Sequence, residues 1–187
     1  GMRSSLASRE AIADTVELTM RGHGYDALVG LAGCDKSLPG MMMAMVRLNT
    51  PSVFIYGGSI LPGRAPSGAD IPTEYANRDL TVQDMFEAVG RHQAGGLSDA
   101  ALEVLERVAC PSAGACGGQF TANTMACVSE AIGLALPQSS GAPAPYESRD
   151  QYSIASGEAV MNLLAKNIRA RDVVTLESLQ NAARVVA

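Results

Sequence analysis

A strand, a helix and a second strand are predicted within residues 27–56, and this segment constrains the fold more than any other. Residues 27–32 are an apolar run of the kind found in buried strands, and residues 41–48 predict a helix that ends before Pro51. Residues 52–56 predict the second strand. The unit has the length, about 30 residues, of a right-handed crossover between parallel strands. We therefore expect an α/β fold of three layers, α/β/α, with a mostly parallel sheet in a helix-rich partial domain.

Most of the remaining chain is predicted to be helical. Capping residues and apolar spacing predict further helices at residues 9–21, 81–93, 98–108, 120–136, 150–166 and 175–186. Residues 61–79 contain three prolines and two glycines, which predicts a loop or lid. A chain of 187 residues with 47% hydrophobic and 18% charged residues has a globular composition. We expect a single domain over residues 1–187.

Charge and cysteine spacing exclude several classes of protein. The net charge is -5 at pH 7, and no cluster of Lys and Arg resembles a nucleic-acid-binding surface. The apolar runs are shorter than the roughly 18 residues that a membrane-spanning helix needs. Four cysteines fit neither a disulfide scaffold nor a zinc pattern, which favours a reducing compartment. We expect a cytoplasmic protein with no nucleic-acid or membrane partner, or an organellar one if the source is eukaryotic.

The turn after the first predicted strand contains three reactive side chains in succession. Cys34, Asp35 and Lys36 lie between that strand and the next helix, and ligands collect at such turns in parallel sheets. A nearby helix amino terminus favours a metal-binding thiolate, and a carboxylate is a hard oxygen ligand. Lys36 is a candidate base if burial or a cationic neighbour keeps its amine neutral. The alternative is a small buried Cys followed by a solvated Asp and Lys, and these residues alone leave both interpretations open.

A second loop combines cysteine with small residues. Residues 110–119 have the sequence Cys-Pro-Ser-Ala-Gly-Ala-Cys-Gly-Gly-Gln, which leaves the backbone free to curve around a ligand. Cys116 is expected just before the amino terminus of the helix at 120–136, whereas Cys127 falls inside that helix and is expected in the core. Gly57-Gly58-Ser59, directly after the second strand, offers backbone amides to a ligand but is equally consistent with a simple turn.

The two loops together resemble those of the dihydroxy-acid dehydratase and phosphogluconate dehydratase family. The resemblance rests on Gly33-Cys-Asp-Lys-Ser-Leu-Pro-Gly40 and on Gly114-Ala-Cys-Gly-Gly-Gln-Phe-Thr-Ala-Asn-Thr-Met125, and it extends over essentially the whole chain. Cys-Asp-Lys-x-x-Pro-Gly followed at this distance by Ala-Cys-Gly-Gly is a very specific combination. Residues 117–125 look most like the branch that acts in branched-chain amino-acid (valine and isoleucine) biosynthesis.

The resemblance implies a metal-dependent loss of water. It implies that Cys34 and Cys116 bind an iron-sulfur cluster, [2Fe-2S] rather than [4Fe-4S], that acts as a Lewis acid. Asp35 matches a Mg²⁺ ligand, and Lys36 matches a lysine that is carbamylated in several members and supplies a further oxygen ligand. The implied reaction converts a 2,3-dihydroxy acid, a small-molecule substrate, into a 2-oxo acid. The implied full-length enzyme is a homodimer.

Several functional residues of the family have no counterpart in this sequence. In the family, a third cluster cysteine and a further Mg²⁺-binding Asp lie upstream of the position that matches Gly1 of this sequence. A metal-binding Glu and a Ser proposed as the base lie in the family's carboxyl-terminal domain. The chain therefore resembles the central part of the amino-terminal iron-sulfur and Mg²⁺-binding domain, and we expect it to be inactive alone. The alternatives are a sugar-acid dehydratase of the same family acting on phosphogluconate or an aldonate, a scaffold fragment that binds no metal, and, less favoured, a redox or iron-carrier module.

Overall fold

The main body of the protein is built around a small parallel sheet. The computed structural model describes residues 4–187, in which β1 (Leu28–Ala32) pairs in parallel with β2 (Ser52–Tyr56). Leu28 lies opposite Ser52, and Ala32 lies opposite Tyr56. The two strands are joined by α2 (Ser37–Leu48), as the sequence predicted. The prediction of a helix-rich α/β fold with a parallel sheet is therefore confirmed.

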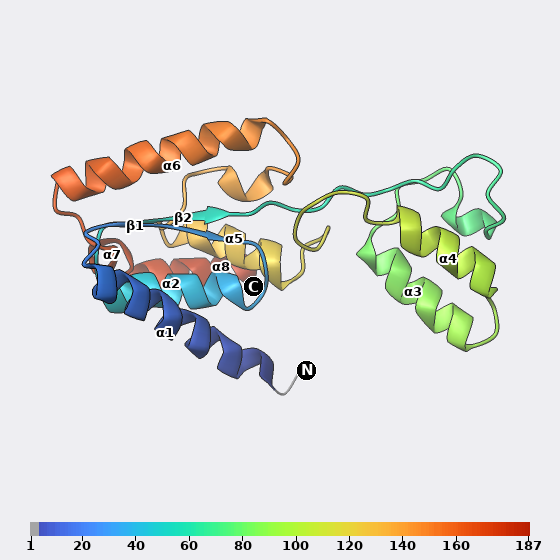
Figure 1. The fold of residues 1–187 in the computed structure, drawn as a ribbon, viewed down its shortest axis with the longest axis horizontal. Helices are drawn as coiled ribbons and strands as arrows, with labels where there is room; N and C mark the ends of the chain where they lie inside the picture. The colour runs from blue at the N-terminus through green and yellow to red at the C-terminus, as the bar shows by residue number, and fades with distance from the viewer. Residues whose placement is uncertain (1–3) are drawn as a thin grey trace.

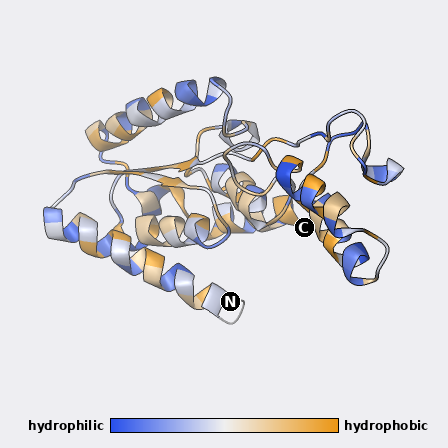
Figure 2. Cartoon of the chain, turned by 45° about the vertical axis from the view of Figure 1, so that its right-hand side comes forward, coloured by the Kyte–Doolittle hydropathy of each residue, from blue (hydrophilic) through white to orange (hydrophobic). Residues whose placement is uncertain are grey.

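Helices cover both faces of the sheet. The other helices of the main body are α1 (Ser5–His23), α5 (Thr121–Ala131), η3 (Ser139–Gly141), α6 (Ser148–Ala165), α7 (Ala170–Val173) and α8 (Leu176–Val186). In Figure 1, α6 lies on one side of the strands, and α1, α2, α5 and α8 lie on the other. In Figure 2 the hydrophobic colour follows the strands and the inner helices, whereas α1 is mixed along its length. None of the helices within residues 4–187 combines the length and hydrophobicity that a bilayer-crossing segment requires.

The core of the main body lies between the sheet and the helices α2 and α5. Leu38, Met42 and Met45 of α2 are buried against Phe54 and Tyr56 of β2. Side chains alternate between the two faces of a strand, so Phe54 and Tyr56 point to the same side. This side faces α2 and α5, and the aromatic side chains of β2 therefore lie in the core of the main body.

The helix predicted at residues 120–136 is shorter in the structure, and this prediction was wrong at its carboxyl end. α5 ends at Ala131, and Gly133 adopts a left-handed conformation with φ of +85°. The chain then turns toward β2, where the Phe54 N–H donates to the Leu134 carbonyl (2.7 Å) and Ala135 forms a parallel bridge with Phe54. The apolar residues after Ala131 therefore extend the sheet and not the helix.

Residues 61–112 form a separate unit, here called the α3–α4 lobe. It contains η2 (Thr73–Tyr75), α3 (Val82–Gln93) and α4 (Asp99–Val108), and residues 61–79 are otherwise irregular, as predicted. In Figure 1 the lobe projects from the main body on two extended segments. Its own hydrophobic cluster contains Tyr75, Leu80, Ala88, Leu97, Ala101, Leu105 and Ala109. The single domain expected over residues 1–187 stays a prediction, and the structure adds that the chain has a second apolar core.

Gly63 closes the base of the lobe. Its N–H lies within hydrogen-bonding distance of the carbonyls of Leu80 (2.9 Å) and Ala109 (3.1 Å). A Cβ atom at Gly63 would lie 1.5 Å from the Val108 carbonyl oxygen, a clash with backbone that no side-chain movement can relieve. The base of the lobe therefore requires glycine at this position.

We predict that Gly63→Ala lowers the free energy of unfolding of the lobe by at least about 1–3 kcal/mol because backbone segments must separate. The matched control is Gly90→Ala in α3, where a Cβ meets no atom within 4 Å. This control should stabilise the helix by up to about 1 kcal/mol. Hydrogen exchange of α3 and α4 amides measures both effects, and equal protection in the two variants would contradict the prediction.

A pH-dependent interaction fixes the start of α3. Asp84 accepts hydrogen bonds from the Thr81 N–H (2.7 Å) and hydroxyl (3.1 Å), and its carboxylate also pairs with Arg78. Burial by itself would raise the pKa of Asp84, but the Arg78 guanidinium and the Thr81 donors outweigh burial and hold the pKa below its ordinary value. The resulting stabilisation is complete above the unfolded-state pKa and is lost as the pH falls through the lower, folded-state pKa.

We predict that Asp84→Asn lowers the free energy of unfolding by about 1–2 kcal/mol at pH 7, since it removes the charge from the cap and from the pair with Arg78. The difference from the unmodified protein should shrink as the pH falls below 3.8, the ordinary value for an aspartate. Urea unfolding at pH 7 and pH 3 tests this. A difference that stays constant with pH would mean that the charge of Asp84 contributes nothing.

Candidate active site

The carboxyl ends of β1 and β2 lie side by side and lead into two of the loops singled out from the sequence. The Gly57 N–H donates to the Ala32 carbonyl (2.7 Å), and this bond joins the two strand ends. The turn with Cys34 follows β1, and Gly57-Gly58-Ser59 follows β2. Ligands of parallel sheets collect at this edge, so the edge is the first place to look for a site.

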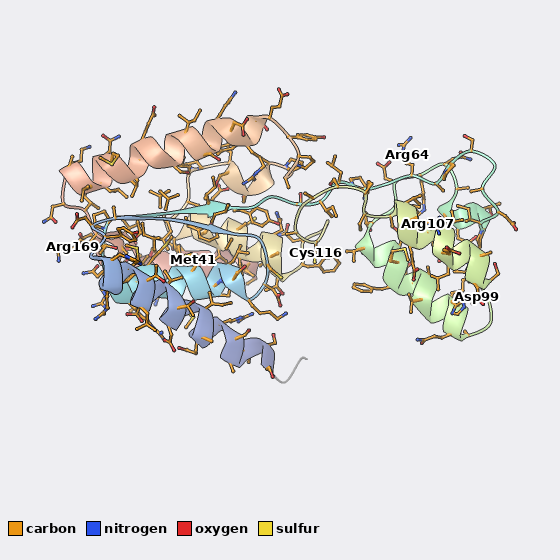
Figure 3. The ribbon with its side chains drawn as sticks, in the orientation of Figure 1. Met41, Arg64, Asp99, Arg107, Cys116 and Arg169 are labelled. Carbon is orange, nitrogen blue, oxygen red and sulfur yellow. The ribbon has the colours of Figure 1, made fainter. Side chains whose placement is uncertain are left out.

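The Cys116 loop is fixed to the same edge by backbone hydrogen bonds. The Ala115 N–H donates to the Gly58 carbonyl and the Ile60 N–H donates to the Ala115 carbonyl, both at 2.8 Å. Ala115 thereby forms a parallel bridge with Ser59, and Cys116 follows directly. Figure 3 shows Cys116 where the main body meets the α3–α4 lobe. Residues 117–120 separate Cys116 from α5, which begins at Thr121, one residue later than predicted.

Cys34, Asp35 and Lys36 form one cluster of interacting side chains. The Cys34 thiol lies 3.2 Å from Asp35 Oδ1, and Lys36 Nζ lies 3.0 Å from the same oxygen. Hydrogen bonds from Lys36 and, to a smaller extent, from Cys34 lower the pKa of Asp35. Asp35 is therefore an ionised carboxylate at neutral pH. The Lys36 side chain is 39% exposed beside this anion, and its amine donates to the carboxylate.

Ser37 holds the backbone of this turn. The Cys34 N–H donates to Ser37 Oγ (3.1 Å), and the Ser37 hydroxyl lies 3.2 Å from the Cys34 carbonyl oxygen. The Leu38 N–H also donates to that carbonyl (2.9 Å), which links the turn to the first residues of α2. Pro39 lies in this first turn of the helix, a position that suits its missing N–H. Cys34 is exposed and accessible on a turn whose backbone is well defined.

The structure brings the predicted residues to one edge but does not combine them into a complete metal site. Among residues 4–187, no three His, Cys, Asp or Glu side chains gather closely enough to hold a metal ion. Cys34 interacts with Asp35, whereas Cys116 lies exposed on the neighbouring loop. The predicted roles of Cys34, Asp35, Lys36 and Cys116 therefore stay predictions.

The other two cysteines lie in less accessible places. Burial raises the pKa of the Cys110 thiol, and the negative charge of Cys116 adds to this effect, so the thiolate is disfavoured. Cys127 is partly buried, with its sulfur 3.8 Å from Ser140 Oγ and 3.9 Å from Gln119 Nε2. Cys127 was expected in the core, and in the structure it is only partly buried.

Two buried polar side chains near the edge were missed by the sequence interpretation. The Arg149 guanidinium donates to the carbonyls of Tyr56 and Ala142, and burial lowers the pKa of this group. Tyr56 is fully buried, and its hydroxyl has no hydrogen-bond partner within the described part of the chain. Only the position of Tyr56 at the end of a strand, before two glycines, could have drawn attention to it. Nothing in the sequence around Arg149 indicated burial.

Two cavities differ in the chemistry that they offer. A groove of about 370 Å³ between α2, α5 and α8 is lined almost entirely by methionine, valine, leucine and isoleucine. A second pocket, of about 350 Å³, opens at the strand ends and includes Leu31, Gly57, Arg149 and Asp150 among its lining residues. The first groove has one charged lining residue, Arg47, whereas the second has Glu147, Arg149 and Asp150, so the strand ends are the better candidate for an active site.

Comparisons with known proteins agree with the motifs at this edge. A family model described as dihydroxy-acid/6-phosphogluconate dehydratase N-terminal matches residues 1–187. The chain is 80% identical over 187 residues to a dihydroxy-acid dehydratase of Dinoroseobacter shibae, with 100% of this chain and 31% of the relative covered. It is 72% identical to the dihydroxy-acid dehydratase of Parvibaculum lavamentivorans and 70% identical to that of Pelagibacter ubique, with the same coverage in both cases.

The chain spans about a third of the length of these curated relatives. A match over all 187 residues, at an identity of 70–80% to several relatives, is far more than a shared motif. It includes both cysteine loops and the α3–α4 lobe between them. This chain belongs to the dihydroxy-acid/6-phosphogluconate dehydratase family.

Proposed function

We propose that this chain forms part of the active site of a hydro-lyase that converts a 2,3-dihydroxy acid into a 2-oxo acid in branched-chain amino-acid biosynthesis. The observation that carries the proposal is the cluster of Cys34, Asp35 and Lys36 at the edge to which the Cys116 loop is also hydrogen-bonded. The three relatives named above are dihydroxy-acid dehydratases, and their names support this choice of substrate class.

The donor atoms at this edge fit part of an iron-sulfur and Mg²⁺ site. Cys34 and Cys116 are exposed thiols, which are the soft ligands that iron-sulfur clusters take, and Asp35 is an ionised hard ligand of the kind that Mg²⁺ takes. Two thiols and one carboxylate are too few for both groups. We expect the remaining ligands in the part of the full-length protein that corresponds to the rest of the relatives' length.

The reaction requires a departing hydroxyl to be stabilised and a proton to be removed. The bond between C3 and its hydroxyl breaks, the proton on C2 leaves, and the resulting enol becomes the 2-oxo acid when C3 takes up a proton. When bound, an iron-sulfur cluster and Mg²⁺ would supply Lewis acidity toward the departing oxygen and the carboxylate of the substrate. In this proposal Cys34 and Cys116 hold the cluster, Asp35 holds Mg²⁺, and the Ser37 hydrogen bonds keep the Cys34 backbone in place.

Lys36 is the candidate catalytic residue of the cluster and also a candidate metal ligand. Its amine is 3.0 Å from Asp35 Oδ1, so a group added to Nζ would lie next to the Mg²⁺ that Asp35 is proposed to bind. Carbamylation would require the ammonium to lose one proton, after which the neutral amine would join CO₂ and lose a second proton, so that a cation becomes an anionic oxygen ligand.

We predict that Cys34→Ser and Cys116→Ser each reduce the iron and sulfide content of the anaerobically reconstituted full-length protein and abolish dehydration of a branched 2,3-dihydroxy acid. A serine oxygen is a much poorer cluster ligand than a thiolate. Cys127→Ser is the matched control, since this partly buried thiol lies inside α5, and it should retain both cluster and activity.

Three outcomes would contradict the assignment. A wild-type protein that binds no iron would support the scaffold alternative, and equal losses in all three variants would point to a general structural effect. If the full-length protein prefers an aldonate to the branched 2,3-dihydroxy acid, the chain belongs to a sugar-acid dehydratase.

We predict that Asp35→Asn raises the Mg²⁺ concentration needed for half-maximal activity by at least about tenfold, because an amide is a weaker ligand for a hard cation. Iron and sulfide content should remain as in the wild type. Asp26→Asn, at an exposed position between α1 and β1, is the matched control and should change neither quantity. If Asp35→Asn needs the same Mg²⁺ concentration for half-maximal activity as the wild type, Asp35 is not a Mg²⁺ ligand.

A further inference from the structure

We propose that a cavity between the segment after β2 and the start of α3 holds the alkyl groups of the substrate, and that Ile60 and Val82 determine which 2,3-dihydroxy acids are accepted. This inference rests on the proposed function and names the part of the chain that selects the substrate. It gives the α3–α4 lobe a direct part in that selection.

The cavity lies where the main body meets the α3–α4 lobe. It has a volume of about 250 Å³, and its apolar lining residues are Ile60, Leu61, Pro62 and Val82. The first three follow β2 in the chain, and Val82 is the first residue of α3. No charged side chain within residues 4–187 lines it. The cavity therefore suits an uncharged part of a ligand and not a carboxylate.

The polar lining groups offer few hydrogen bonds to a ligand. The Thr81 hydroxyl is already bonded to Asp84 (3.1 Å). Burial raises the pKa of the Cys110 thiol, and a neutral thiol behaves as a small hydrophobic group. Ser59 bears the remaining side-chain hydroxyl of the lining. Most of the wall therefore meets a ligand as hydrocarbon or as a neutral thiol.

The cavity is adjacent to Cys116. Gly117, the next residue, is among its lining residues, and a Cβ atom at Gly117 would lie 3.2 Å from the Cγ2 methyl group of Ile60. The Ile60 N–H also donates to the Ala115 carbonyl (2.8 Å), so Ile60 is held against the Cys116 loop. Figure 3 shows Cys116 at this junction of the main body and the lobe. A group in the cavity therefore lies beside the loop of a proposed cluster ligand.

The chemistry of the substrate explains why an apolar cavity belongs at this place. In the proposed reaction the departing hydroxyl is bonded to C3, and the alkyl groups of a branched acid are bonded to the same carbon. A site that places the departing oxygen near Cys34 and Cys116 must also accommodate those alkyl groups nearby. An aldonate has hydroxyl-bearing carbons there, and these would lose hydrogen bonds to water without replacement. The cavity therefore favours a branched acid over a sugar acid.

The two selected residues belong to different parts of the chain. Ile60 is fixed to the Cys116 loop, whereas Val82 belongs to the lobe, so both parts bound the cavity. Val82 is partly exposed at the first position of its helix, where a change of side-chain size is tolerated by the fold. Its size can therefore be changed without altering Cys34, Asp35, Lys36 or Cys116.

The test changes the size of the wall and measures the preference between two substrates that differ by one methylene. The full-length protein is assayed with the 2,3-dihydroxy acid that has two methyl groups at C3 and with the one that has a methyl and an ethyl group. Val82→Ala should raise the ratio of kcat/KM for the longer acid to that for the shorter acid by about tenfold, and Val82→Ile should lower it by about the same factor.

Val89→Ala and Val89→Ile are the matched controls. Val89 lies in the same helix, is 38% exposed and does not line the cavity. Both control variants should keep the wild-type ratio.

A second readout does not depend on catalysis. The corresponding 2-hydroxy acids, which lack the C3 hydroxyl and cannot lose water from C3, are titrated into the same full-length proteins by calorimetry. The ratio of their Kd values should show that Val82→Ala favours the longer acid and Val82→Ile the shorter one. A substitution that only disturbed the fold would weaken the binding of both acids alike and leave the ratio constant.

The inference and the proposed function fail in different ways. If the wild type dehydrates the branched acids but neither Val82 variant changes the ratios, or the Val89 variants change them equally, the cavity is not the alkyl site and the proposed function stands. If the wild type dehydrates neither branched acid, the proposed function is wrong, and this inference with it. If Val82→Ala does not fold, Val82→Ile alone decides.

Discussion

The parallel pairing of β1 and β2 is the constraint on which the rest of the molecule depends. Because parallel strands end at the same edge, the turn after β1 and the segment after β2 are brought together by backbone hydrogen bonds alone, including that between Gly57 and Ala32. The bridge between Ser59 and Ala115 then adds a third segment to that edge. Side-chain identity decides what the edge can bind, but the backbone decides that these three segments meet.

The sequence predicted the part of the fold that depends on local patterns. The crossover unit, the helix α3 and the helix α4 lie within a few residues of their predicted bounds, because apolar spacing and caps act over short distances. The carboxyl end of α5 was wrong because the apolar residues after Ala131 are equally suited to a strand, and only their pairing with Phe54 decides between the two. The independent core of the α3–α4 lobe was missed for a similar reason, since its contacts connect Leu80 with residues far along the chain.

The candidate site was predictable to the extent that its residues are adjacent in sequence. Cys34, Asp35 and Lys36 are neighbours in the chain, and their contacts follow from that. The position of Cys116 beside the segment that follows β2 could be predicted only from the fold. The burial of Tyr56 and Arg149 could not be predicted from the pattern of a single strand or helix. The family resemblance suggested the candidate ligands, whereas the geometry showed which groups surround them.

The base of the α3–α4 lobe also bears on how the chain can reach this arrangement. Ser59 and Ala115 must meet although 55 residues separate them, and closing so long a loop costs conformational entropy. The hydrogen bonds between Gly63, Leu80 and Ala109 close most of that loop within the lobe itself. If the lobe folds early, the two ends of the loop are therefore already close together. Ser59 and Ala115 then have to move only a short distance to form their bridge. Such a lobe would help to form the edge at which Ser59 and Ala115 meet, although it contributes few side chains to that edge.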